Sequence, residues 1–91
     1  MAGKIRTQVE SQEYTNAFQK IGDAKELDAA LAGLTLSISI NPADWPIVPG
    51  FKDIRLAKTD ATKDAPVLSI WFRVLDMDTI FLLYIEASKE V

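Results

Sequence analysis

The strongest constraint on the fold is a pair of apolar segments, residues 67–75 and 79–86, separated by Asp76-Met77-Asp78. Aspartate favours tight turns because its carboxylate accepts hydrogen bonds from nearby backbone amides, so we interpret both aspartates as turn formers and expect no metal site. In the first segment an apolar residue occupies every second position, as on one face of a β-strand; these residues are Leu68, Ile70, Phe72 and Val74. The second segment is apolar on both faces, as in a central strand. Together they predict an antiparallel β-hairpin.

A third C-terminal strand is predicted over residues 53–58, with Ile54 and Leu56 directed towards the core. Proline lacks a backbone donor and disfavours helix at the preceding residue. Residues 41–50 are therefore predicted to form a loop, since they contain Pro42, Pro46 and Pro49. Trp45 in this loop has two readings: an apolar plug folded onto the core, or an exposed aromatic that binds a partner.

A first helix is predicted over residues 12–21. Its apolar face consists of Tyr14, Phe18 and Ile21, which recur at helical spacing. Ser11 can cap the N-terminus of this helix, and Gly22 favours its termination.

A second helix is predicted to begin after Asp23, because Asp23 and Glu26 have the spacing of a capping box. The short connection predicts an αα-hairpin with the first helix. Helical spacing continues through Leu27, Ala30, Leu31, Leu34 and Ile38. Residues 35–40 also alternate like a strand and are rich in β-branched residues. Propensity alone leaves helix and strand equally favoured there.

Composition indicates one α+β domain. The chain has 91 residues, of which 48% are apolar and 25% are charged, which suits a globular protein with a single core. Residues 1–10 predict a short N-terminal strand in which Ile5 and Val9 are apolar. We therefore expect a strand, two helices and a three-stranded antiparallel meander, with both helices on one face of an antiparallel sheet.

The absence of two residue types narrows the chemistry. The sequence contains no cysteine and no histidine, which removes disulfides, thiolate nucleophiles and the commonest general base. We expect no cofactor. A net charge of −3 argues against broad electrostatic binding of nucleic acid. The sequence has no apolar run near the roughly 20 residues that span a bilayer, and no signal-peptide core, so we expect a cytoplasmic protein.

The C-terminal 40 or so residues resemble the RelE/ParE toxin superfamily. The resemblance rests on Ile54-Arg55-Leu56, on residues 68–74, on the aspartate turn and on residues 80–86, and it is weaker over the helices. It implies the strand, two-helix and meander arrangement, and it favours helix for residues 35–40. Active members of this superfamily cleave messenger RNA on the ribosome with a basic cluster on the sheet, and some also use a tyrosine near the C-terminus.

The resemblance also implies site residues. Arg55, Arg73 and Lys89 fall where catalytic residues are expected, and Lys52 and Lys58 fall where RNA phosphates are bound. The sequence departs from the family at Asp53, where members have a basic residue, and at Ser69, where they have arginine. It also lacks the tail tyrosine. Lys52, Arg55, Lys58 and Lys63 equally fit a solvated strand edge, where lysine discourages aggregation.

Three functions remain open at this point. The first is the toxin-like component of a type II toxin-antitoxin system, which acts on the ribosome and messenger RNA. The others are a non-catalytic protein-interaction module and a gyrase inhibitor of the ParE type. A cognate antitoxin is the expected partner, with Trp45 and Trp71 as contact residues. A homodimer is expected only if the apolar C-terminal strand lies at a sheet edge.

Overall fold

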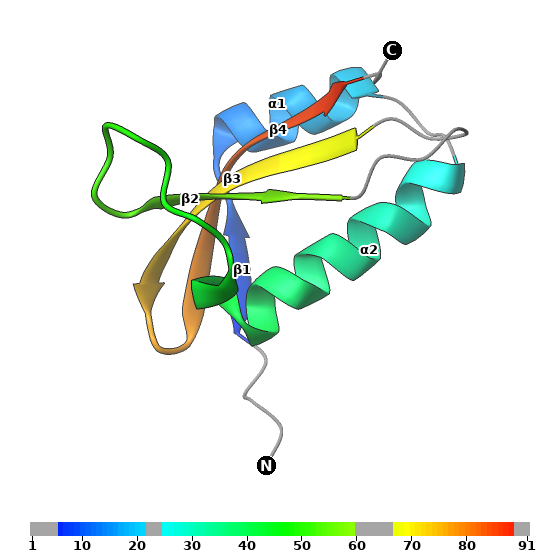
Figure 1. The fold of residues 1–91 in the computed structure, drawn as a ribbon. Coiled ribbons are helices and arrows are strands. Elements are labelled where there is room, and N and C mark those ends of the chain that lie inside the picture. Colours follow the sequence, from blue (N-terminus) through cyan, green and yellow to red (C-terminus); the bar gives the residue numbers. More distant parts are fainter. Residues whose placement is uncertain (1–5, 22–24, 60–66, 89–91) are drawn as a thin grey trace.

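The structure is a computed structural model that describes residues 6–21, 25–59 and 67–88 (Figure 1). Four strands and two α-helices form one α+β unit. The elements, in chain order, are β1 (Thr7–Glu10), α1 (Gln12–Ile21), α2 (Lys25–Ile40), the short 3-10 helix η1 (Pro42–Asp44), β2 (Ile54–Lys58), β3 (Val67–Asp76) and β4 (Thr79–Ser88).

The strands form one sheet in the order β1-β4-β3-β2. The pairs β2–β3 and β3–β4 are antiparallel, whereas β1 runs parallel to β4, with Thr7 opposite Thr79. The sheet is therefore mixed, and the expectation of a wholly antiparallel sheet is wrong. The difference arises because β1 joins the sheet beside β4, so that both helices, β2 and β3 lie in the connection between the two parallel strands.

Helix α1 begins at the predicted cap. The Ser11 hydroxyl accepts a hydrogen bond from the Tyr14 backbone N–H at 2.9 Å and donates one to the Leu83 carbonyl at 2.7 Å. The Ser11 backbone N–H also donates to the Leu82 carbonyl at 2.9 Å. One residue thus closes the N-terminus of α1 and attaches it to β4, beside which α1 lies (Figure 1).

Helix α2 extends through residues 35–40, so the helical reading of that segment is confirmed. Leu34 and Ile38, four residues apart, are both buried, while Leu36 between them is 48% exposed. A strand would have placed all three residues on one face. The two helices do not pack as a simple hairpin pair, because α1 lies mainly against β4 and α2 lies against β2, β3 and η1.

Both helices cover the same face of the sheet. Their buried side chains pack with those of the strands in one core, which contains Tyr14, Ala17, Leu34, Ile38, Ala57, Leu68, Ile70, Phe72, Ile80, Leu82 and Ile85. The register of β3 and β4 shifts between two adjacent positions: Trp71 is opposite Tyr84, but Phe72 is opposite Leu82. Such a bulge reorients the following side chains, which explains why Leu82 and Ile85, three residues apart, are both buried.

The register of β2 corrects the predicted orientation of its side chains. Ile54 pairs with Arg73 and Leu56 pairs with Trp71, on the face opposite the helices. Ala57, which pairs with Ile70, is the fully buried residue of this strand. The small side chain of Ala57 leaves room for α2 on the core side, while the larger Ile54 and Leu56 are half-buried on the other face.

Candidate functional site

The two arginines predicted to act together lie on opposite faces of the sheet. Directly paired residues of adjacent strands have their side chains on the same face. Arg55 pairs with Phe72, which is fully buried beneath the helices, whereas Arg73 pairs with Ile54 on the other face. The structure therefore does not bring Arg55 and Arg73 into one site.

Arg73 forms an ion pair within the chain. Its Nη2 lies 2.7 Å from Asp53 Oδ2, and the two side chains are 43% and 54% exposed. Exposed pairs of this kind contribute about 0–1 kcal/mol to stability. Asp53 therefore neutralises the charge of Arg73 in this fold.

Arg55 holds the proline-rich loop against β2. Its Nη1 donates to the Trp45 carbonyl at 2.6 Å. Backbone hydrogen bonds from Val48 to Ile54 (2.8 Å) and from Leu56 to Pro46 (3.0 Å) continue this contact along the outer side of the strand. Trp45 is half-buried and packs against the core, as the plug reading expected. Among the residues that the structure describes, this contact uses one of the five Arg55 N–H groups.

A cavity of about 390 Å³ lies between this loop, β2 and the start of β1. Three cationic side chains line it: Arg6, Lys52 and Arg55. Asp53 is the acidic residue in the lining, and its carboxylate also pairs with Arg73. The cavity is therefore locally positive in a chain whose net charge is −3.

Arg6 is the residue of this cavity that the sequence did not indicate. Its Nη1 donates to the carbonyls of Ser39 and Ile40, both at 3.1 Å, at the C-terminus of α2. A cation at that end of a helix interacts favourably with the unpaired carbonyls and the helix dipole. The Arg6 Nε is buried and has no hydrogen-bond partner among the described residues. The sequence near Arg6 does not indicate that this residue binds the end of α2, because Ser39 and Ile40 lie more than 30 residues away in the chain.

The other predicted residues are dispersed. Lys58 is exposed at the far end of β2 from Lys52. Trp71 lies on the face opposite the helices, where its ring contacts Tyr84 at 5.7 Å between centroids. Lys89 and Lys63 lie outside the described residues. Of the predicted charged site residues, the structure thus brings together Lys52 and Arg55 and adds Arg6 to them.

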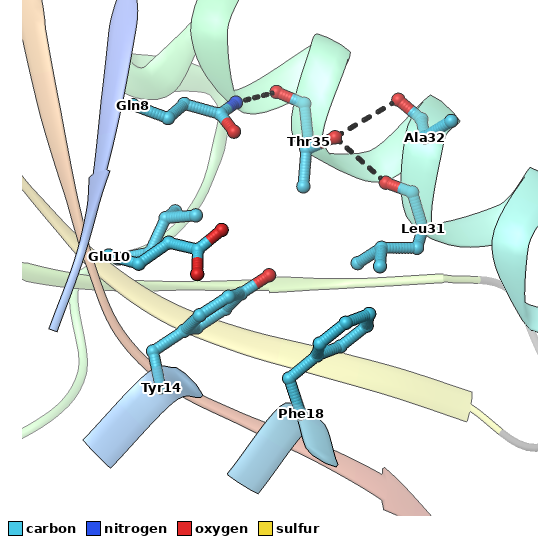
Figure 2. Close-up of a pocket in the computed structure, with 8 residues that line it drawn as sticks. Gln8, Glu10, Tyr14, Phe18, Leu31, Ala32 and Thr35 are labelled. Carbon is cyan, nitrogen blue, oxygen red and sulfur yellow. Dashed lines mark hydrogen bonds between the residues drawn. The ribbon is translucent and has the colours of Figure 1, made fainter. Parts of the chain in front are cut away.

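A second cavity, of about 250 Å³, separates the two helices (Figure 2). Its lining includes Tyr14 and Phe18 from α1 and Leu31 and Thr35 from α2. Burial, and then the Glu10 carboxylate, raise the pKa of Tyr14 from 10.0 to about 12. The phenol therefore keeps its proton at neutral pH and can donate a hydrogen bond.

Comparisons with known proteins leave the chain without an assigned family: no family model matches the sequence, and no curated protein matches it significantly. In the part of the chain that the structure describes, the helices are too short or too polar to cross a membrane.

Proposed function

We propose that the chain is a cytoplasmic, toxin-like protein of the RelE/ParE type that binds the RNA backbone at the cavity lined by Arg6, Lys52 and Arg55. The observation that supports this proposal is that three cations line one cavity of about 390 Å³, with Arg6 distant in the chain from Lys52 and Arg55. Arginine and lysine are the side chains that bind phosphate most favourably, arginine through its planar fork of donors.

Each cation has a distinct part in this proposal. Arg55 is anchored by the Trp45 carbonyl, which orients its remaining donors. Arg6 contributes the positive charge of a guanidinium that is held in place by the Ser39 and Ile40 carbonyls. Lys52 is exposed at the rim and supplies a mobile positive charge. The three together suit a phosphodiester better than a neutral ligand.

The geometry supports RNA binding more strongly than RNA cleavage. Cleavage by the 2′-hydroxyl needs cations around the reacting phosphate to stabilise the developing charge. Arg73, which the resemblance makes catalytic, lies on the opposite face and is paired with Asp53. Arg55 is therefore the residue on which any remaining ribonuclease activity depends.

The binding test is fluorescence anisotropy with a labelled single-stranded RNA over a range of salt concentrations. Lys52→Ala should weaken binding and reduce the slope of log affinity against log salt by about 0.7, the value for one lost phosphate contact on a single strand. Lys58→Ala is the matched control, since Lys58 is an exposed lysine at the other end of β2. Equal slopes for the two variants would contradict the proposal.

The cellular test is growth after induction of the chain alone, with its soluble accumulation confirmed. We expect growth arrest, relief of the arrest by Arg55→Gln, and no relief by Arg73→Ala. Arrest that persists in Arg55→Gln would exclude this cavity as the toxic site. Normal growth with abundant folded wild-type protein would exclude toxicity in that host.

A second candidate function is a non-catalytic interaction module that binds an amphipathic segment of a cognate antitoxin. The observation that favours it is the aromatic pair on the face opposite the helices, where Tyr84 is 46% exposed beside Trp71. Aromatic side chains with an apolar body and a polar end are enriched at protein interfaces. We expect Tyr84→Ser to prevent co-purification with a cognate antitoxin. Met77→Ser, at the 83% exposed turn, should have no effect.

A further inference from the structure

The cavity between the helices is lined by the side chain of a buried tyrosine. Tyr14 is 3% exposed as a residue and is part of the cavity lining. Its ring is fixed by stacking on Phe18, with 6.4 Å between centroids and 6° between planes. Figure 2 shows the hydroxyl directed into the cavity, close to the Glu10 carboxylate. A hydroxyl that faces a cavity can exchange hydrogen bonds with a ligand, because it carries one donor and two acceptor lone pairs.

The polar groups around this hydroxyl are hydrogen-bond acceptors. Glu10 accepts a hydrogen bond from Thr15 at 3.2 Å, and its carboxylate has further lone pairs. The Gln8 amide nitrogen donates to the Thr35 carbonyl at 2.7 Å and to the Ser39 hydroxyl. These bonds use the amide donors and leave the Gln8 amide oxygen as an acceptor. The described lining contains no lysine or arginine, so a bound cation would meet the Glu10 carboxylate without a competing positive charge in the lining.

The rest of the lining is apolar. Phe18 and Leu31 face one another across the cavity from α1 and α2. Leu82 of β4 also lines it. The volume of about 250 Å³ is below the roughly 300–1,000 Å³ of most ligand pockets. The cavity therefore suits a group of amino-acid size and excludes a nucleotide. Aromatic ring faces add a favourable interaction with a cation.

We propose that this cavity binds a small organic cation, a primary ammonium or guanidinium group on a short apolar stem. The cationic group donates hydrogen bonds to the Glu10 carboxylate and the Tyr14 hydroxyl oxygen, while the stem packs against Phe18, Leu31 and Leu82. This site is separate from the basic cavity beside β2, because the two linings share no residue. Its ligand has the opposite charge to RNA.

Two sources supply this chemistry: a free amine, or the side chain of a lysine or arginine in a peptide. The test is to titrate each probe into the 91-residue chain and to monitor binding by the changes in backbone amide chemical shifts in NMR spectra. The probes are n-butylamine, agmatine and an acetylated Gly-Lys-Gly amide, with n-butanol and butyrate as neutral and anionic controls of the same stem. We expect shifts at residues around the cavity with the cations and none with butyrate.

Variants test the assigned contacts. Glu10→Gln keeps the shape and removes the charge, so we expect at least tenfold weaker binding of n-butylamine. Tyr14→Phe keeps the ring stack and removes the hydroxyl, with a several-fold loss expected. Glu13→Gln is the matched control, because Glu13 is an exposed carboxylate on α1 outside the cavity. Circular dichroism establishes that each variant is folded.

The outcomes separate clearly. Binding of n-butylamine that Glu10→Gln weakens and Glu13→Gln does not supports the site. Tighter binding of agmatine then indicates a free amine as the ligand, whereas tighter binding of the peptide indicates a side chain of another protein. No binding of any cation, or equal binding of butylamine and butyrate by the wild-type chain, would overturn the proposal even if a variant failed to fold. RNA binding is measured separately and does not depend on this result.

Discussion

The hydroxyl of Tyr14 shows how one residue responds to its surroundings. Its pKa is raised to about 12 by burial and by Glu10, so the folded chain retains this proton where an unfolded tyrosine would lose it. A raised pKa in the folded state stabilises the fold below pH 10, and that contribution is lost as the pH rises through 12.

The consequence is alkaline sensitivity that depends on Tyr14. By pH 12 the wild-type chain should lose on the order of 2 kcal/mol of unfolding free energy from this group, since each pKa unit corresponds to about 1.4 kcal/mol. Urea unfolding at pH 8, 10 and 11.5 should show a steeper decline for the wild type than for Tyr14→Phe. Parallel declines in the two proteins would show that Tyr14 is not the group responsible.

Individual residues also show what the sequence could and could not predict about the site. Lys52 and Arg55 were predicted because the family resemblance implies site residues at these positions of the sequence. Arg6 was missed because its role depends on the carbonyls at the end of α2, which only the tertiary fold brings near it. The grouping of Arg55 with Arg73 failed because strand register, which sequence alternation does not set for an edge strand, places them on opposite faces.

At the scale of elements, Ser11 connects helix α1 to strand β4. Ser11→Ala removes the N-cap bond to Tyr14 and the bond to the Leu83 carbonyl together. We expect a loss of about 1–2 kcal/mol in unfolding free energy, measured by urea denaturation, because a serine cap alone contributes about 1 kcal/mol. Ser88→Ala, at the exposed end of β4, is the control and should change stability by less than about 0.5 kcal/mol.

The elements themselves were predictable to different degrees. Helix α1 was predicted from its Ser11 cap and the helical spacing of its apolar residues. The β3–β4 hairpin was predicted from its apolar segments and the aspartate turn between them. Both elements form where expected. Residues 35–40 were ambiguous because their β-branched residues favour a strand while Leu34 and Ile38 have helical spacing. The burial of Leu34 and Ile38 in the core favours the helix, and this tertiary contribution outweighs the local preference of the β-branched residues for a strand. The parallel pairing of β1 could not be predicted, because no turn connects it to β4.

At the scale of the whole molecule, the strand order limits self-association. The apolar strand β4 lies between β1 and β3, so it offers no free edge for a dimer. Of the two edge strands, β1 has four residues, and the backbone of the loop at Pro46 and Val48 is hydrogen-bonded to β2. Short or covered edges resist pairing with a second copy.

We therefore expect a monomer at micromolar concentrations. Sedimentation equilibrium should give a mass near 10.1 kDa. A stable species of twice that mass would show that a face of the sheet, rather than an edge, mediates association. Tyr84→Ser would then test the aromatic pair with Trp71 as its contact.

The parallel pairing of Thr7 with Thr79 has a consequence for how the chain reaches its native state during synthesis. Strand β1 is synthesised well before β4, its neighbour in the sheet. Pairing over such a sequence distance carries a large loop-closure cost and slows folding. The nascent chain must therefore keep β1 unpaired until β4 has left the ribosome, and the native sheet closes only after that point.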